Sequence, residues 1–330
     1  MILEKRIEAG FGARPNLEGR MLLLLNAADR KTRKEFLRII GQTKAVVTLE
    51  KLALLFEQGN FPGALALLDD MGDAFADAVN QAYLTAGQST AAVIAAQANR
   101  PLIRFNSSNN RAVARMSITR GRLIQAMREN EQARLAHILG SGLQEGLRMD
   151  EIARTFRDGL GLTPHQQKSV LNFRRMLETG DRQALSRTLR DRRFDPTLNR
   201  LLGADGEGLS QAQIDRMVER YEQRFIAHRS NVISRTESVR AVHEGDEDMW
   251  QQAVDNGTVR AEDITTRWIT SADERVRGSH AAMNGQLAAF GQPFTSGNGN
   301  QLRFPGDSMA PASDTINCRC VLDRTIPQAG

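Results

Sequence analysis

The chain has 330 residues, 41% of them hydrophobic, so it can bury one large core or two ordinary ones and is not a disordered polypeptide. Its two cysteines, Cys318 and Cys320, stand one residue apart, which excludes a secreted fold held together by many disulfides. No apolar run approaches the ~20 residues needed to cross a bilayer, and the N-terminus carries no secretion signal. We therefore expect a soluble chain, made in a cytoplasm, without a membrane segment.

The net charge of +5 is distributed unevenly along the chain. Residues 236–330 contain eight Arg, no Lys and thirteen acidic residues, a net charge of −5. Residues 1–235 contain 36 basic and 26 acidic residues, a net charge of +10. Most of the positive charge is arginine, which can pair with phosphate groups through two parallel hydrogen bonds. The positive charge of residues 1–235 is compatible with a nucleic-acid-binding surface, and equally with an ordinary solvent-exposed helical surface.

From about residue 16 to 260, apolar residues recur every three or four positions, which is the spacing of amphipathic helices. One apolar stripe predicts a helix over residues 36–56, and a second helix is expected over 65–99. Asn and Ser residues at 106–110 predict a loop, and a further long helix follows over 112–139. The first 140 residues are thus expected to form long helices.

Between residues 141 and 235 the predicted helices become shorter and their start signals clearer. Thr163 precedes Pro164, and Gln166 follows three residues after Thr163, which together predict a helix that begins with a capping box. Similar signals place further helix starts near residues 196 and 211. Residues 215–254 are expected to form one long helix or a helix pair.

After residue 260 the pattern changes to short strands and loops. Residues 267–270 and 318–323 are strand candidates, and a capping box at Ser271 predicts a brief helix. Residues 291–315 are rich in Gly, Pro, Ser and Asn. We predict a mostly α fold, with an elongated helical N-terminal body and a small α+β C-terminal domain. Its expected segments are a long-helix region (1–140), a short-helix, Arg-rich region (141–235) and an α+β domain (236–330).

The two cysteines can be read as metal ligands. On a strand, residues 318 and 320 point to the same face, so two thiolates together with His280 would supply three ligands of a tetrahedral zinc site. His243, Asp273 or water could supply the fourth ligand. The alternative is a pair of small buried side chains beside a hydrogen-bonded histidine. Zinc is therefore a candidate cofactor, and no catalytic residue is assigned.

Several charged residues in the last hundred positions form a second candidate cluster. They could form a small polar site or a buried ion-pair network that holds the helical body to the terminal domain, and we favour the network. The residues are Arg235, Glu237, Asp273, Arg275 and Arg277.

Five short motifs in the C-terminal part follow one another in a characteristic order. They are Arg235-Thr236-Glu237; Trp268-Ile269-Thr270; Arg277, His280 and Gly285; Pro305-Gly306-Asp307; and Asn317-Cys318-Arg319-Cys320. In this order and spacing, over roughly residues 140–325, the chain resembles the phage Mu F-like minor head proteins, also called the phage head morphogenesis domain family.

The resemblance implies a virion protein present in few copies. Such a protein is made in the host cytoplasm, binds the portal protein inside the head, contributes to head morphogenesis and in some relatives is delivered with the DNA. Residues 1–140 become the candidate portal-docking region. One alternative function is a zinc-dependent hydrolase or nuclease acting after delivery, with Glu237 or Asp273 as general base. Another is a nonspecific DNA-binding protein. We favour a protein without enzymatic activity.

The stretch from residue 168 to 200 holds nine basic and four acidic residues, so it is the best candidate for contact with packaged double-stranded DNA or with an acidic portal surface. Few aromatic residues accompany them, so base stacking is not expected. The predicted contact residues are Lys168, Arg174, Arg175, Arg182, Arg187, Arg190, Arg192 and Arg193.

Overall fold

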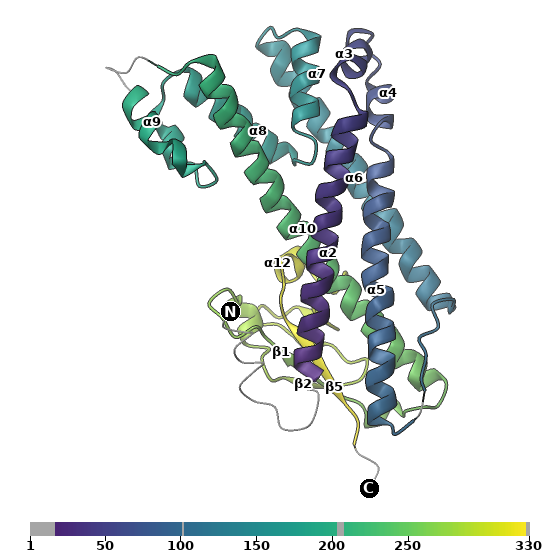
Figure 1. Cartoon of the computed structure of the whole chain (residues 1–330). Helices are drawn as coiled ribbons and strands as arrows, with labels where there is room; N and C mark the ends of the chain where they lie inside the picture. The colour runs from purple at the N-terminus through teal and green to yellow at the C-terminus, as the bar shows by residue number, and fades with distance from the viewer. Residues whose placement is uncertain (1–16, 101, 203–207, 328–330) are drawn as a thin grey trace. The chain divides into compact units, whose positions relative to one another are not determined.

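The computed structural model describes residues 17–100, 102–202 and 208–327 (Figure 1). The structure is 67% helical, with a small C-terminal region of antiparallel strands, which confirms the predicted fold class. Residues 1–16 of the predicted long-helix region lie outside the described residues. None of the described helices combines the length and the hydropathy that crossing a bilayer requires.

The helical part of the chain runs from residue 17 to residue 255. Its α-helices are α2 (Leu17–Val46), α3 (Leu49–Glu57), α4 (Phe61–Ala66), α5 (Asp70–Gln97), α6 (Asn110–Gln144), α7 (Met149–Asp158), α8 (Pro164–Glu178), α9 (Asp195–Leu201) and α10 (Gln211–Asp255). Two short 3-10 helices, η1 (Arg182–Ser186) and η2 (Arg192–Phe194), lie between α8 and α9.

The three predicted helix starts are confirmed at α8, α9 and α10. At α8, Gln166 N–H donates to the Thr163 hydroxyl and Thr163 N–H donates to the Gln166 side chain, which completes the predicted capping box. Residues 215–254, for which one helix or a pair was expected, lie in the single 45-residue helix α10.

Two helices that were predicted to be continuous are each divided in the structure. The stripe over residues 36–56 is broken at Thr48, whose hydroxyl accepts the Lys51 N–H and so begins α3 as a separate helix. A threonine that follows two β-branched valines favours such a local bond over continuation of the helix. The helix expected over 65–99 likewise divides, because α4 ends at Ala66 and α5 begins at Asp70.

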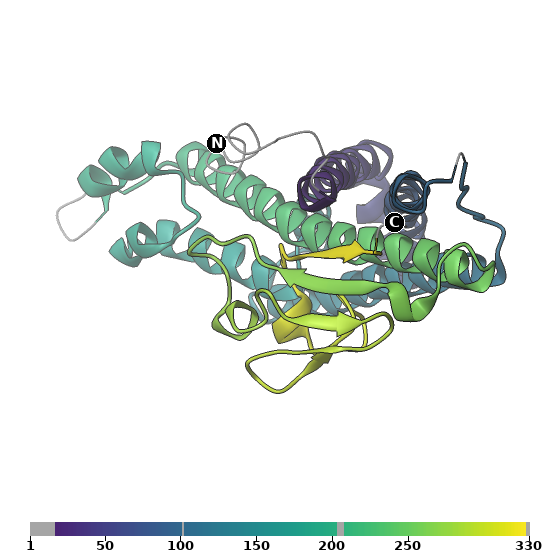
Figure 2. The ribbon, with the colours of Figure 1, turned by 90° about the horizontal axis from the view of Figure 1, so that it is seen from below.

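The C-terminal part adds short elements around a three-stranded sheet. They are η3 (Ala261–Asp263), β1 (Thr265–Ile269), α11 (Gly278–Ala281), β2 (Leu287–Ala289), β3 (Phe294–Thr295), β4 (Gln301–Leu302), α12 (Ala312–Thr315) and β5 (Val321–Thr325). Strand β1 is central and pairs antiparallel with both β2 and β5; β3 pairs with β4. In Figure 2 the sheet lies along α10.

Two details of the predicted α+β part differ from the structure. The strand expected from Cys318 begins only at Val321, so both cysteines precede β5. No helix starts at Ser271, because the Asp273 carboxylate accepts the Arg275 N–H and forms a turn. Helix α11 begins instead at Gly278.

Internal contacts divide the described residues into two compact units. Unit 1 takes residues from Met1–Glu35, Phe75–Gly121 and Val232–Gly330, and unit 2 takes residues from Phe36–Ala74 and Arg122–Asn231. The segment boundaries expected at residues 140 and 235 lie inside α6 and α10. The three sequence segments therefore remain a prediction, separate from these units.

In unit 1, α5 and α10 pack closely, and buried residues of both helices join Val259 and Ile264 in one hydrophobic cluster around Trp250. Gly245 of α10 permits this approach, because a Cβ at this position would overlap the Tyr83 carbonyl oxygen of α5. Other residues of α10 contact the C-terminal part, so α10 has no exposed residue between 236 and 250.

Unit 2 has its own cores. One cluster contains Phe173, Leu177, Leu198 and Tyr221, with the rings of Phe173 and Tyr221 4.3 Å apart. Elsewhere in unit 2, the fully buried Arg134 is satisfied by the Glu131 carboxylate and the Phe156 carbonyl. These clusters stabilise the helices that carry the predicted basic residues.

Replacing Gly245 by Ala tests the close packing of α5 and α10. Alanine normally stabilises the interior of a helix by about 0.5–1 kcal/mol relative to glycine. At residue 245 we expect the opposite sign, a loss of about 1–3 kcal/mol, because the added methyl group overpacks a filled contact. Thermal unfolding measures the change.

Gly121→Ala in α6 is the matched control, because a Cβ at this position meets no atom within 4 Å and should stabilise. Equal effects of the two substitutions would contradict the proposed contact.

Candidate functional site

Helix α10 is the element that gathers the C-terminal motifs. The Thr236 hydroxyl accepts the N–H of Asn317 at 2.9 Å, and Arg240 donates to the carbonyl of Gly306 at 3.1 Å. One turn further along, His243 Nε2 donates to the Cys320 carbonyl at 3.3 Å. Three separate motifs of the sequence therefore meet along one helix.

The Pro-Gly-Asp loop is shaped to lie on α10. Gly306 has φ +82°, and a Cβ there would lie 3.0 Å from the backbone nitrogen of Arg240. Glycine is required by both the left-handed conformation and the close approach. Asp307 closes the loop, because its buried carboxylate accepts two side-chain bonds from Arg303 and the backbone N–H of Met309.

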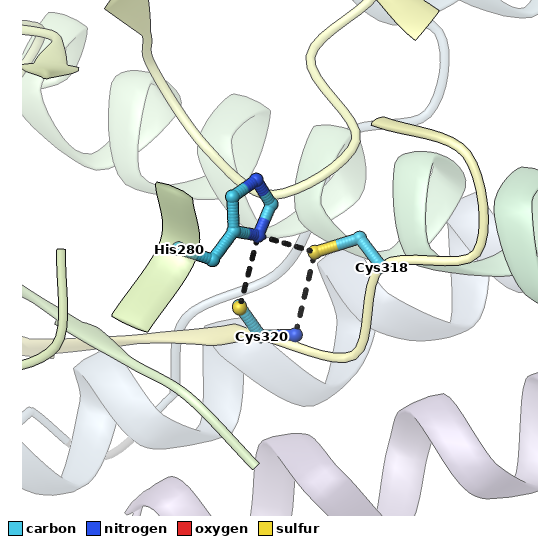
Figure 3. A group of neighbouring side chains, drawn as sticks. All are labelled: His280, Cys318 and Cys320. Atoms are coloured by element: carbon cyan, nitrogen blue, oxygen red, sulfur yellow. Dashed lines mark hydrogen bonds between the residues drawn. The ribbon is translucent and has the colours of Figure 1, made fainter. Parts of the chain in front are cut away.

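The predicted metal ligands lie together (Figure 3). His280 Nδ1 is 3.6 Å from Cys318 Sγ and 3.5 Å from Cys320 Sγ. The three side chains are 2%, 2% and 3% exposed, respectively. Helix α11 supplies the imidazole, and the turn before β5 supplies both sulfurs. The two cysteines were predicted to lie on a strand, which is wrong because β5 begins only after them. The segment before β5 nevertheless brings both thiols close to the same imidazole nitrogen.

The two thiols have different protonation tendencies. The hydrogen bond with Cys320 and the neighbouring His280 hold the pKa of the Cys318 thiol well below its ordinary value, although burial opposes this. The bond with Cys318 and burial raise the pKa of Cys320. Thiolate is the form of cysteine that binds metals.

Asp314 is a member of this site that the sequence analysis did not identify. Its fully buried carboxylate lies 3.7 Å from His280 Nε2 and accepts hydrogen bonds from Ser279, Ser296 and Asn300. An isolated Asp in a segment rich in Pro, Ser and Asn has no distinguishing pattern in the sequence. Only the folded chain places it behind the imidazole.

The two residues predicted as alternative fourth ligands have other partners. Burial lowers the pKa of His243 to about 3, so its ring is neutral, and Nε2 bonds to the Cys320 carbonyl. Asp273 is paired with Arg319 at 2.6 Å. Among the described residues, the group of potential ligands within mutual reach consists of His280, Cys318 and Cys320.

The charged residues predicted as one network are distributed over separate contacts. Four of these five residues each contact a partner outside the predicted set. The fifth, Arg275, is 77% exposed and lies near Glu274. The partners are Asp29 for Arg235, Arg240 for Glu237, Arg319 for Asp273, and the carbonyl of Ile316 for Arg277.

A buried charged cluster that the sequence analysis missed lies further along α10. The Arg324 guanidinium, 4% exposed, pairs with Asp246 and Glu247, and Asp246 also accepts a bond from the Thr90 hydroxyl at 2.7 Å. Asp248 pairs with Arg115 at 2.8 Å. The run Glu-Gly-Asp-Glu-Asp at 244–248 is typical of a solvated face. Its burial becomes favourable because arginines of α6 and β5 and hydroxyl groups of α5 pair with its carboxylates.

The predicted basic contact residues are largely paired inside unit 2. Lys168, Arg187 and Arg192 form no ion pair with any residue that the structure describes. Each of the others binds a partner: Arg174 with Asp215, Arg175 with Glu145, Arg182 with Asn199, Arg190 with Asp195, and Arg193 with Asp191.

Replacing Arg324 by Leu should destabilise unit 1 strongly. Removing one partner of a buried ion pair leaves the acidic residues uncompensated, which costs about 3–5 kcal/mol. Denaturant unfolding measures this loss. Arg260→Leu, which removes an exposed arginine paired with Asp263, should leave stability unchanged within error. A neutral Arg324→Leu would mean that the buried carboxylates are satisfied in another way.

The chain also matches the model of a known family. Residues 133–323 match the family described as Phage Mu protein F like protein, a span of more than half of the chain. The match includes α10, the cysteine–histidine cluster and the Pro-Gly-Asp loop. No curated protein and no solved structure matches the chain. The chain belongs to the Phage Mu protein F like family of phage head morphogenesis proteins.

Proposed function

We propose that this virion component is a minor head protein that binds the portal protein inside the capsid and contributes to head assembly. The observation that carries the proposal is the family match over residues 133–323. Location near the portal and delivery with the genome are the finer parts of the same proposal. Interaction with other head components follows from membership of a head morphogenesis family.

We place the portal-docking surface in the long helices of residues 1–140. The described helices of this region include exposed apolar side chains that a partner could cover. In α6, Val113 is 50% exposed and Ile118 is 70% exposed. Both lie on one helix within unit 1.

A structural role is preferred over a zinc-dependent hydrolase or nuclease. A catalytic metal needs an open coordination position that a substrate can reach. Here the three potential ligands are at most 3% exposed. The two residues suggested as general base, Glu237 and Asp273, are paired with Arg240 and Arg319.

Contact with packaged DNA is a second, weaker part of the proposal. Lys168 and Arg192 are exposed and form no ion pair within the described residues, so phosphate groups could reach them without breaking a contact. The paired arginines would first have to leave their acidic partners. Any DNA contact would therefore use few charges and would not depend on base sequence.

Portal binding is tested with full-length variants, because residues 236–330 share unit 1 with α5 and the start of α2 and cannot be assumed to fold alone. Val113→Glu/Ile118→Glu should weaken binding to the phage's portal protein at least tenfold, since losing the burial of one large apolar side chain costs about 1.5–3 kcal/mol. Co-purification and titration with the portal protein measure binding.

The matched control is Leu287→Glu/Met309→Glu, which changes two exposed apolar residues of the C-terminal part. This variant should bind like the native protein. If the control loses binding while the α6 variant keeps it, the docking surface lies in the C-terminal part instead.

The DNA contact is tested with Lys168→Glu/Arg192→Glu. Binding to duplex DNA should weaken, and the slope of log K against log salt concentration should fall by about 1.8 if both residues contact phosphates. Arg260→Glu/Arg275→Glu makes the same charge change in the acidic segment and should have a smaller effect. Equal losses would indicate that only the total charge matters, and native binding insensitive to salt would exclude phosphate contact.

A further inference from the structure

We propose that His280, Cys318 and Cys320 bind one zinc ion, through Nδ1 of the imidazole and both thiolates. Zinc–sulfur bonds of about 2.3 Å and zinc–nitrogen bonds of about 2.0–2.1 Å in a tetrahedron separate the nitrogen from each sulfur by about 3.5–3.6 Å. The observed separations are 3.6 Å to Cys318 and 3.5 Å to Cys320. The two nitrogen–sulfur distances thus match a tetrahedral site, and all three donor atoms lie within 4.8 Å of one another (Figure 3).

Hydrogen bonding alone explains this spacing less well. A neutral imidazole has one acceptor nitrogen with one lone pair, which can accept one thiol proton well. Here both sulfurs lie at nearly equal distances from His280 Nδ1. A single cation between the three atoms satisfies all of them at once.

The balance of charge also favours a divalent ion. Two thiolates, one neutral imidazole and one Zn²⁺ sum to zero, so the metal and its three ligands add no net charge to the buried site. The two thiol protons leave to solvent when the metal binds. Thiolate ligands select soft or borderline ions such as zinc over magnesium or calcium.

Asp314 acts as the positioning residue of the site. Its carboxylate faces His280 Nε2, which has no hydrogen-bond partner among the described residues at ordinary distance. A small movement would let Nε2–H donate to this carboxylate, which fixes the tautomer that leaves Nδ1 free to bind the metal. Bonds from Ser279, Ser296 and Asn300 hold the carboxylate in place.

The metal would connect parts of the chain that are far apart in sequence. His280 is 38 residues from Cys318 and 40 residues from Cys320. The intervening segment contains only short strands and one-turn helices, so a metal cross-link between its two ends would stabilise its fold. The burial of the three ligands makes the role of the site structural.

Metal analysis and cobalt substitution of the full-length protein test the proposal. We expect about one zinc ion per chain, and an ultraviolet thiolate-to-cobalt band when Co²⁺ replaces it. Cys318→Ser/Cys320→Ser should lose both signals. His165→Gln is the control, because His165 is an exposed histidine outside this group of potential ligands, so the variant should retain both signals.

If the cysteine variant does not fold, the melting temperature of the native protein still tests the proposal. A strong chelator should lower the melting temperature of the native protein, and added zinc should restore it. Native protein without zinc, without the cobalt band and without a response to chelator would overturn the proposal.

The role of Asp314 is tested by metal affinity. Asp314→Asn should weaken zinc binding about 10–100-fold while the thiolate-to-cobalt band is retained, and Asp314→Glu should restore part of the affinity. A lower melting temperature of the metal-free Asp314→Asn protein with unchanged zinc affinity would show that Asp314 only supports the fold.

Discussion

The buried polar stripe of α10 is the feature on which the organisation of unit 1 depends. Thr236, Arg240, His243 and Glu247 follow one another at intervals of three or four residues, so they share one face of the helix. Polar groups buried along a helix need hydrogen-bond or ion-pair partners to offset the loss of water. Each of the four contacts a segment from the C-terminal part, namely Asn317, Gly306, Cys320 and Arg324. The requirement for pairing thus determines where the C-terminal segments lie.

This constraint explains why small residues recur at the contacts. Gly245 lets α5 approach α10, and Gly306 lets the Pro-Gly-Asp loop lie on the backbone of Arg240. Larger residues would separate the surfaces and leave the polar stripe exposed to partial solvation. The same stripe holds the turn that carries both cysteines, so helix packing and the arrangement of the sulfurs are physically linked.

The candidate site and the proposed function are therefore parts of one architecture. A buried cluster of potential metal ligands lies beside α10, in the part of the chain that the family match covers. Membership of a head morphogenesis family implies interaction with other head components. Because four of the eight arginines in the 168–200 stretch bind acidic partners inside unit 2, the number of basic residues overstates the charge available for DNA.

Local signals in the sequence by themselves determined the mostly α class, the starts of α8, α9 and α10, and the trio His280, Cys318 and Cys320. Capping and helical periodicity act within a few residues, so the sequence shows them directly. The metal-ligand trio is recognised by the donor atoms of its residue types. Only the tertiary structure decided the break at Thr48, the place of Asp314 behind His280, and the burial of the acidic run at 244–248. The physical reason is that each depends on a partner distant in sequence, or on competition between local bonds and packing, and neither leaves a periodic pattern in the chain.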